Sequence, residues 1–240
     1  AFAMPGPWWS AHGITTVAYD QRGFGQAPNG GLWPGDDVLR MDLRDCVDAV
    51  RAKYPGLPVY ALGDSMGGAV VLSSLGGAEP LRVDGVVLVA PAVWSRTDMP
   101  ASYRSALWLI AHTAPWLTVS GKGLGIWPSD NIAMMRAMSR DPLMQHETRA
   151  DAIWGLVNLM DDARRTAAKL KGEDPPPILV VYGAKDQIIP AKPTDAVIDA
   201  LGTNAQSRRY EYGYHLLLRD LSAERVWRDI AGWIETGTLP

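Results

Sequence analysis

The stretch Gly63-Asp64-Ser65-Met66-Gly67-Gly68 decides the fold of this chain, because it places a serine between glycines where two apolar segments meet. Residues 59–62 before it predict a short buried strand, and the small apolar residues from position 68 onward predict a buried helix. A serine on the sharp turn between them occupies sparsely allowed φ/ψ space. We expect positions 63 and 67 to require glycine, because the strand and helix backbones approach closely there and leave no room for a side chain. The stretch therefore predicts a nucleophile elbow, with the backbone N–H of Met66 facing an oxyanion.

A serine hydroxyl is a weak nucleophile, so it needs a base within hydrogen-bond reach and an acid that orients the base. The chain has four histidines: His12, His112, His146 and His215. Of these, His215 lies on an expected loop after a predicted strand over residues 208–212. Asp186 lies in the turn that follows the β-prone run 177–182. The order Ser65, Asp186, His215 is that of hydrolases with such an elbow. Three alternatives stay open: the stretch at Ser65 could be an ordinary strand-to-helix turn, Asp186 could have only a turn-forming role, and His215 could be a buried structural histidine.

Four motifs carry a resemblance to a known family: Ala18-Tyr19-Asp20-Gln21-Arg22-Gly23-Phe24-Gly25, the elbow at 63–68, Gly183-Ala184-Lys185-Asp186 with Ile189-Pro190, and Gly213-Tyr214-His215-Leu216-Leu217-Leu218-Arg219-Asp220. With them the chain resembles the serine hydrolases of the α/β-hydrolase fold, within them the monoacylglycerol lipase and lysophospholipase group. The resemblance implies Ser65 as nucleophile, His215 as general base and then acid, and Asp186 as the orienting carboxylate. It implies Met66 N–H as one oxyanion donor. The fold it implies is a mostly parallel sheet flanked by helices, with an inserted helical cap.

The resemblance departs at the front of the chain. Enzymes of this group have a His-Gly loop after an early strand, and that loop supplies a second oxyanion N–H. This sequence begins at Ala1-Phe2-Ala3-Met4, beyond such a loop. We therefore expect N-terminal strands of the fold to be missing. A strand expected over residues 14–19 would then be either separated from the strand at 59–62 by a gap or newly paired with it.

Composition excludes several classes of protein. The 240 residues are 47% hydrophobic, which fits one globular domain with an inserted lid. A net charge of -3 and scattered basic residues argue against a nucleic-acid partner. The single cysteine, Cys46, excludes an internal disulfide, and no ligand pattern indicates a metal or another cofactor. The absence of a leader or a long apolar run favours a cytoplasmic location, with a lost leader peptide left open.

The region 93–159 differs in character from the rest of the chain. It shows no strand pattern and is rich in Trp and Met among helical and Pro-broken segments. We expect a helical cap over 93–159, inserted into a core formed by 1–92 and 160–240. Some of its large apolar side chains should line a path to Ser65 or form an exposed rim that contacts lipid transiently. Trp108 and Met138 are the candidate substrate-binding residues.

These expectations define one enzyme and its rivals. We expect a serine carboxylic-ester hydrolase that acts on monoacylglycerol, lysophospholipid or similar medium-chain esters through an acyl-enzyme. A thioesterase, an amidase or an aminopeptidase of the same fold stays open, because the three residues do not choose the leaving group. A catalytically silent fragment of such a hydrolase is the alternative from a different class.

Overall fold

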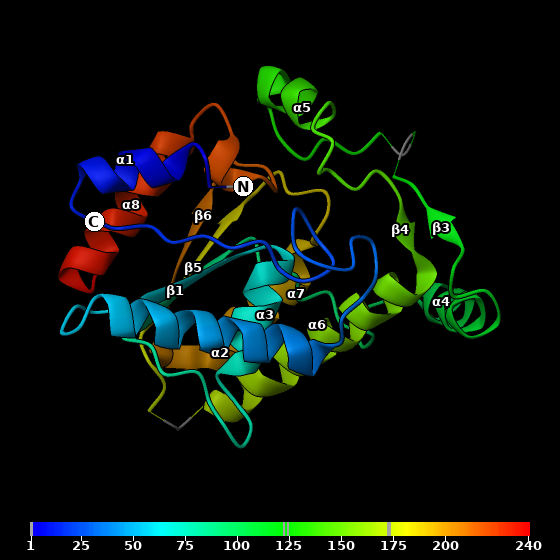
Figure 1. The fold of residues 1–240 in the computed structure, drawn as a ribbon, viewed down its shortest axis with the longest axis horizontal. Helices are drawn as coiled ribbons and strands as arrows, with labels where there is room; N and C mark the ends of the chain where they lie inside the picture. The colour runs from blue at the N-terminus through cyan, green and yellow to red at the C-terminus, as the bar shows by residue number, and fades with distance from the viewer. Residues whose placement is uncertain (1, 122, 124, 172–173) are drawn as a thin grey trace.

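A parallel four-stranded sheet forms the centre of the computed structural model, which describes residues 2–121, 123, 125–171 and 174–240 (Figure 1). The strand order is β1 (Tyr60–Asp64), β2 (Gly85–Val89), β5 (Ile178–Gly183) and β6 (Ala205–Tyr210). Every residue of β2 and β5 is buried. Parallel strands that are covered on both faces read as continuous apolar runs, which is why these two were visible in the sequence.

Helices cover both faces of this sheet (Figure 1). On one face, α1 (Pro5–Ala11) and α8 (Ala223–Thr236) pack against Val87, Leu179 and their neighbours. The other face carries four helices: α2 (Asp36–Lys53), α3 (Met66–Ser74), α6 (Ala150–Leu170) and α7 (Ala191–Leu201). Side chains of a strand alternate between the faces, so β2 contributes Val87 to the first core and Val86 and Leu88 to the second.

Helix α2 begins at Asp36, yet neither Asp36 nor Asp37 is its N-cap. Gly35 holds that position with φ 98°, a conformation that glycine adopts without strain. Both aspartates lie in the first turn, where their negative charge favours the helix dipole. The helix buries Leu39, Leu43 and Val47 on its inner face.

One predicted strand is wrong. Residues 14–20 run extended, yet they belong to neither sheet, and Val17 is 51% exposed. The expected pairing with β1 is absent, because a β-prone sequence becomes a strand only with a hydrogen-bonded partner. The other expected arrangement, a gap beside β1, stays a prediction. The strands expected at 59–62 and 177–182 form with shifted ends, and the one expected at 208–212 begins earlier, at Ala205.

Between β2 and α6 the chain forms α4 (Ala101–Thr113), β3 (Thr118–Val119), α5 (Ile132–Met138) and β4 (Thr148–Arg149). The two short strands pair antiparallel, so the expectation of no strand in this region is wrong at these four residues. Residue 159, the expected end of the cap, lies inside α6, which runs unbroken into the core. The division into core and cap stays a prediction. Within the described ranges, no helix combines the length and the apolar character needed to cross a membrane.

Candidate active site

Ser65 occupies the turn between β1 and α3 in a strained backbone conformation. Its φ is 54° and its ψ is -115°, values rarely seen for a residue with a side chain. Two hydrogen bonds hold it against the end of β2 and the residues that follow: Ser65 N–H donates to Val89 O at 2.9 Å, and Ala92 N–H donates to Ser65 O at 2.9 Å. Strain of this kind persists only where the surrounding structure over-determines it. The observation of such strain at a candidate nucleophile favours a functional role.

Two glycines let the strand and the helix meet at this turn, and one of them differs from the prediction. A Cβ on Gly63 would lie 2.3 Å from Gly67 O, so this position cannot carry a side chain without movement. Gly67 has open space around it, and its predicted need for a missing side chain is wrong. The second close approach occurs at Gly68, where a Cβ would lie 2.8 Å from the Cβ of Pro91.

The structure brings Ser65, His215 and Asp186 together. His215 Nε2 lies 2.8 Å from Ser65 Oγ, and His215 Nδ1 lies 2.8 Å from Asp186 Oδ2. Asp186 follows β5 and His215 follows β6, and the carboxyl ends of parallel strands meet at one edge of the sheet. Both side chains are buried, which keeps this hydrogen-bonded row away from bulk water.

The carboxylate of Asp186 is fixed by its own loop. Its Oδ1 accepts hydrogen bonds from Ile188 N–H at 2.7 Å and Ile189 N–H at 3.0 Å, which leaves Oδ2 toward the histidine. A carboxylate only accepts, so His215 Nδ1 carries the hydrogen of that contact. Nε2 is then the acceptor for the hydroxyl hydrogen of Ser65. The arrangement can remove a proton from the serine.

The backbone N–H of Met66 lies at the start of α3, directly after the serine. Among the described residues it has no hydrogen-bond acceptor. The N–H groups of a first helical turn carry partial positive charge and bind anions. This N–H is therefore free to receive an oxyanion, as predicted for Met66.

The sequence reasoning missed two further polar groups near the serine. Asp64 precedes it, and burial raises the pKa of the Asp64 carboxyl, while the charges of His215 and Arg219 oppose that shift. Its Oδ1 is buried without a hydrogen-bond partner in the described part of the chain, as is the Nε of Arg219. The signal for Asp64 was its place within the elbow, and the signal for Arg219 was its place within the motif around His215.

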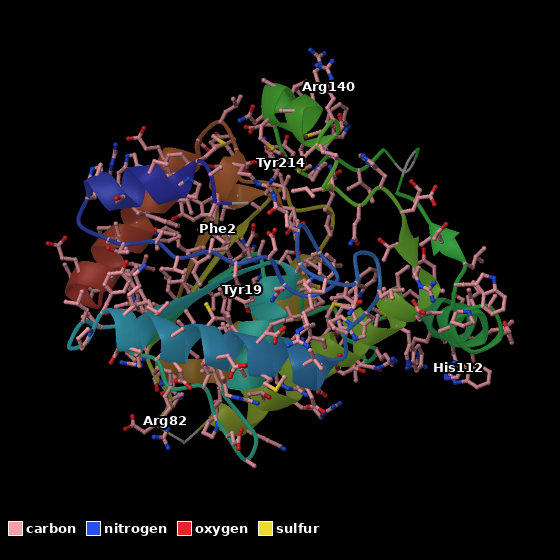
Figure 2. The ribbon with its side chains drawn as sticks, viewed as in Figure 1. Phe2, Tyr19, Arg82, His112, Arg140 and Tyr214 are labelled. Atoms are coloured by element: carbon pink, nitrogen blue, oxygen red, sulfur yellow. The ribbon has the colours of Figure 1, made fainter. Side chains whose placement is uncertain are left out.

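The two candidate substrate-binding residues lie in different surroundings. Met138, at the end of α5, accepts a hydrogen bond on Sδ from Arg219 Nη1 at 3.3 Å, which places it beside the histidine loop. Trp108 lies on α4, is 54% exposed and stacks on His112. Figure 2 shows His112 at the right of the molecule and Tyr214, the neighbour of His215, near its upper middle. Met138 therefore contacts Arg219, four residues after His215, whereas Trp108 lies with His112.

The described residues form no second site comparable to this row: His12 and His112 bind only nearby groups, and no metal-ligand group is present. His12 stacks on Trp8, and both His12 and His112 contact the backbone oxygen of the residue four positions earlier. Across the described ranges, no group of three or more His, Cys, Asp or Glu side chains is placed to hold a metal ion.

Comparison with known proteins identifies the family. A family model described as serine aminopeptidase, S33, matches residues 2–222. The chain is 26% identical over 229 residues to the monoacylglycerol lipase of Mycolicibacterium smegmatis, covering 94% of this chain and 80% of that protein. It is 26% identical over 238 residues to the monoglyceride lipase of Homo sapiens, covering 94% and 74%.

The solved structure of the Paleococcus ferrophilus monoacylglycerol lipase superposes with a TM-score of 0.79 at 19% identity, covering 99% of this chain and 89% of that one. This likeness confirms the predicted fold. The chain thus belongs to the serine aminopeptidase, S33, family of the α/β-hydrolase fold, and with relatives that are lipases and esterases it is a carboxylic ester hydrolase.

Proposed function

We propose that this chain hydrolyses monoacylglycerols and similar medium-chain esters, with Ser65 as nucleophile, His215 as general base and acid, and Asp186 as the orienting carboxylate. The observation that carries the proposal is the hydrogen-bonded row of these three side chains, with 2.8 Å at each step. A nucleophile within reach of a base that a third group orients is the geometry of acyl transfer.

The reaction follows from this geometry. His215 Nε2 takes the hydroxyl proton while Ser65 Oγ forms a bond to the ester carbonyl carbon, and Met66 N–H donates to the resulting oxyanion. Collapse of the intermediate breaks the bond to the leaving alcohol, which takes the proton from His215. A water then gives a proton to His215 and attacks the acyl-enzyme. The carboxylic acid leaves, and Ser65 recovers its proton. Asp186 stabilises the imidazolium in both halves.

The surface of the cap supports a lipid substrate. Four large apolar side chains of α4 and of the stretch between α4 and β3 are exposed: Trp108, Leu109, Trp116 and Leu117. Exposed apolar groups gathered on one region are typical of surfaces that contact lipids or other apolar partners. The named activities of the relatives, monoacylglycerol and monoglyceride lipase, support the same substrate class. We therefore include transient contact of the cap with a lipid surface in the proposal.

The test of the chemistry uses a fluorophosphonate probe and three variants, one of which is a control. The probe should modify Ser65, as read by peptide mapping, and Ser65→Ala should abolish both labelling and hydrolysis while thermal unfolding is unchanged. His215→Ala should be equally damaging, since members of such a triad act as one unit. His112→Ala, a histidine outside the site, should retain wild-type rates. Labelling of another serine, or a sensitive His112, would contradict the assignment.

The substrate class is tested against the two alternative activities, thioesterase and aminopeptidase. A 1-monoacylglycerol should be cleaved faster than the matching acyl thioester and far faster than an amino-acid anilide, which an aminopeptidase would prefer. Met138→Ser should change the preference for acyl length more than the rate on an acetate ester. Trp108→Ser should leave that preference unchanged, since its ring lies with His112. A preference for the anilide would replace the ester proposal by the aminopeptidase.

A further inference from the structure

The segment of residues 127–131, between β3 and α5, bridges the two loops that carry Asp186 and His215. We call it the bridging segment. Figure 1 shows α5, which follows it, on the side of the sheet where β5 and β6 end. Its contacts with the loops are hydrogen bonds. Two of them reach a direct neighbour of His215 or Asp186, and another reaches the neighbour Tyr214 through the side chain of Asp220.

On the histidine side, the bridging segment holds both neighbours of His215. Leu216 N–H donates directly to Pro128 O at 2.8 Å. The other neighbour, Tyr214, is held indirectly: its N–H donates to Asp220 Oδ2 at 2.7 Å, and Ser129 Oγ donates to Asp220 Oδ1 at 2.6 Å. The backbone of the histidine is therefore fixed on either side by groups that depend on this segment.

On the acid side, the contact is to the residue after Asp186. Trp127 N–H donates to Gln187 Oε1 at 2.9 Å. The segment thus connects the acid loop with the base loop, which lie 29 residues apart in sequence. Two loops joined by a third element have fewer relative positions available than two loops that meet only through one His–Asp contact.

At its far end the segment continues into the cap. The side chain of Asn131 accepts from Met134 N–H through Oδ1 at 3.1 Å, which caps α5, and donates through Nδ2 to Arg219 O at 3.0 Å. A single residue therefore joins the first turn of α5 to the loop of the histidine. Movement of α5 is transmitted to that loop through these bonds.

The central pair of this network is fully buried. Ser129 is 0% exposed and Asp220 is 2% exposed. Burial raises the pKa of the Asp220 carboxyl, and the hydrogen bonds from Ser129 and Tyr214 oppose the shift. An apolar pair of similar volume would fill this space without the cost of removing a carboxyl group from water. What the polar pair adds is direction, because a hydrogen bond fixes where the Tyr214 backbone lies.

We propose that the bridging segment positions His215 against Ser65, through Ser129 and Asp220 on the base side and through Gln187 on the acid side, and couples that position to helix α5 of the cap. This inference rests on the proposed function, in which His215 is the base. It adds a role for the cap beyond contact with the acyl chain: the cap helps to build the reacting geometry even for a substrate too short to touch it.

The test compares Ser129→Ala with two serine controls. Ser74→Ala removes an equally buried hydroxyl, bonded within α3, and Ser139→Ala removes an exposed hydroxyl at the other end of α5. For an acetate ester, kcat of Ser129→Ala should fall by about 10- to 100-fold, as expected for a misplaced catalytic group, while KM changes by less than about twofold. Both controls should keep wild-type kcat.

A second measurement does not depend on activity. The proton that His215 Nδ1 donates to Asp186 should give a far-downfield NMR signal in the wild type, and Ser129→Ala should broaden or remove that signal. A folded Ser129→Ala with wild-type kcat and an unchanged signal overturns the proposal. If wild-type protein has this signal but hydrolyses no ester, the proposed function fails instead, and the effect of Ser129→Ala on the signal still decides the inference.

If Ser129→Ala does not fold, Gln187→Ala tests the proposal instead. Gln187 lies on the surface, and its loss removes the acceptor of Trp127 N–H without emptying a buried site. We expect kcat to fall about threefold, the range of one modest hydrogen bond, with KM unchanged and the downfield signal broadened. Unchanged kcat and an unchanged signal in Gln187→Ala would overturn the proposal on this route.

Discussion

Gly63→Ala should damage both folding and catalysis, because the added methyl group meets backbone atoms that no rotamer can move. Its Cβ would lie 2.3 Å from Gly67 O and 2.5 Å from Gly68 N, where ordinary contacts begin at 3.4 Å. The shortfall at the oxygen is 3.4 - 2.3 = 1.1 Å. The elbow must shift by about that distance. A misplacement of about 1 Å costs about 100-fold in rate, and overpacking costs about 1–3 kcal/mol of stability.

The assay measures urea unfolding and kcat on an acetate ester for Gly63→Ala and for its matched control, Gly67→Ala. Gly67 lies in the first turn of α3 with nothing within 4 Å of its added Cβ and with φ outside the positive range. Alanine there should raise stability by about 0.4–1 kcal/mol, because it restricts the unfolded chain. Equal stability and equal kcat in the two variants would refute the reasoning from close approach.

Two further predictions concern stability. The hydrogen bond from Val59 N–H, helped by Arg51, lowers the pKa of Asp84 below 3.8, so its stabilisation is present above that pH and is lost as the pH falls through the depressed value. Asp84→Asn should therefore be less stable than wild type at pH 7. The loss should be at most about 1 kcal/mol, because the Asp84 side chain is 44% exposed. This difference in stability should disappear in acid, and a difference that persists at pH 2 would contradict the prediction. Tyr210→Phe should lose about 1–2 kcal/mol in urea unfolding, because its hydroxyl donates to the buried Asp229 at 2.6 Å, and unchanged unfolding would show that Arg208 alone satisfies this carboxylate.

The row of three residues could be predicted from the sequence for a physical reason. Each member follows an apolar run that can only be a buried parallel strand, and such strands end at one edge of their sheet. The order of the strands in the sheet then decides which of the side chains at their ends can meet. The strand at 14–19 could not be judged in the same way, since its residues favour β structure but pairing depends on a neighbour that lies elsewhere in the chain.

The contacts that surround the row were beyond a sequence argument. Ser129 and Asp220 lie 91 residues apart, and each alone reads as an ordinary loop residue. The second close glycine contact was assigned to Gly67 from the motif, whereas its cause is the approach of Pro91 to Gly68. Both cases depend on which distant segments meet, and neither pattern nor propensity carries that information.

The small β3–β4 pair has a consequence for how this protein could diversify. Val119 pairs with Thr148, so the segment between these two residues starts and ends at neighbouring positions. Closing a longer or shorter loop over such a fixed base costs little, since each doubling of loop length adds only about 0.6 kcal/mol. Grafting a different hairpin loop between these residues is therefore open to evolution and to the engineer. The graft has a limit at Asn131, since everything from Trp127 to that residue also serves the loops of the acid and the base. Residues 139–147, which follow α5, are the portion open to exchange, and new substrate ranges should arise there first.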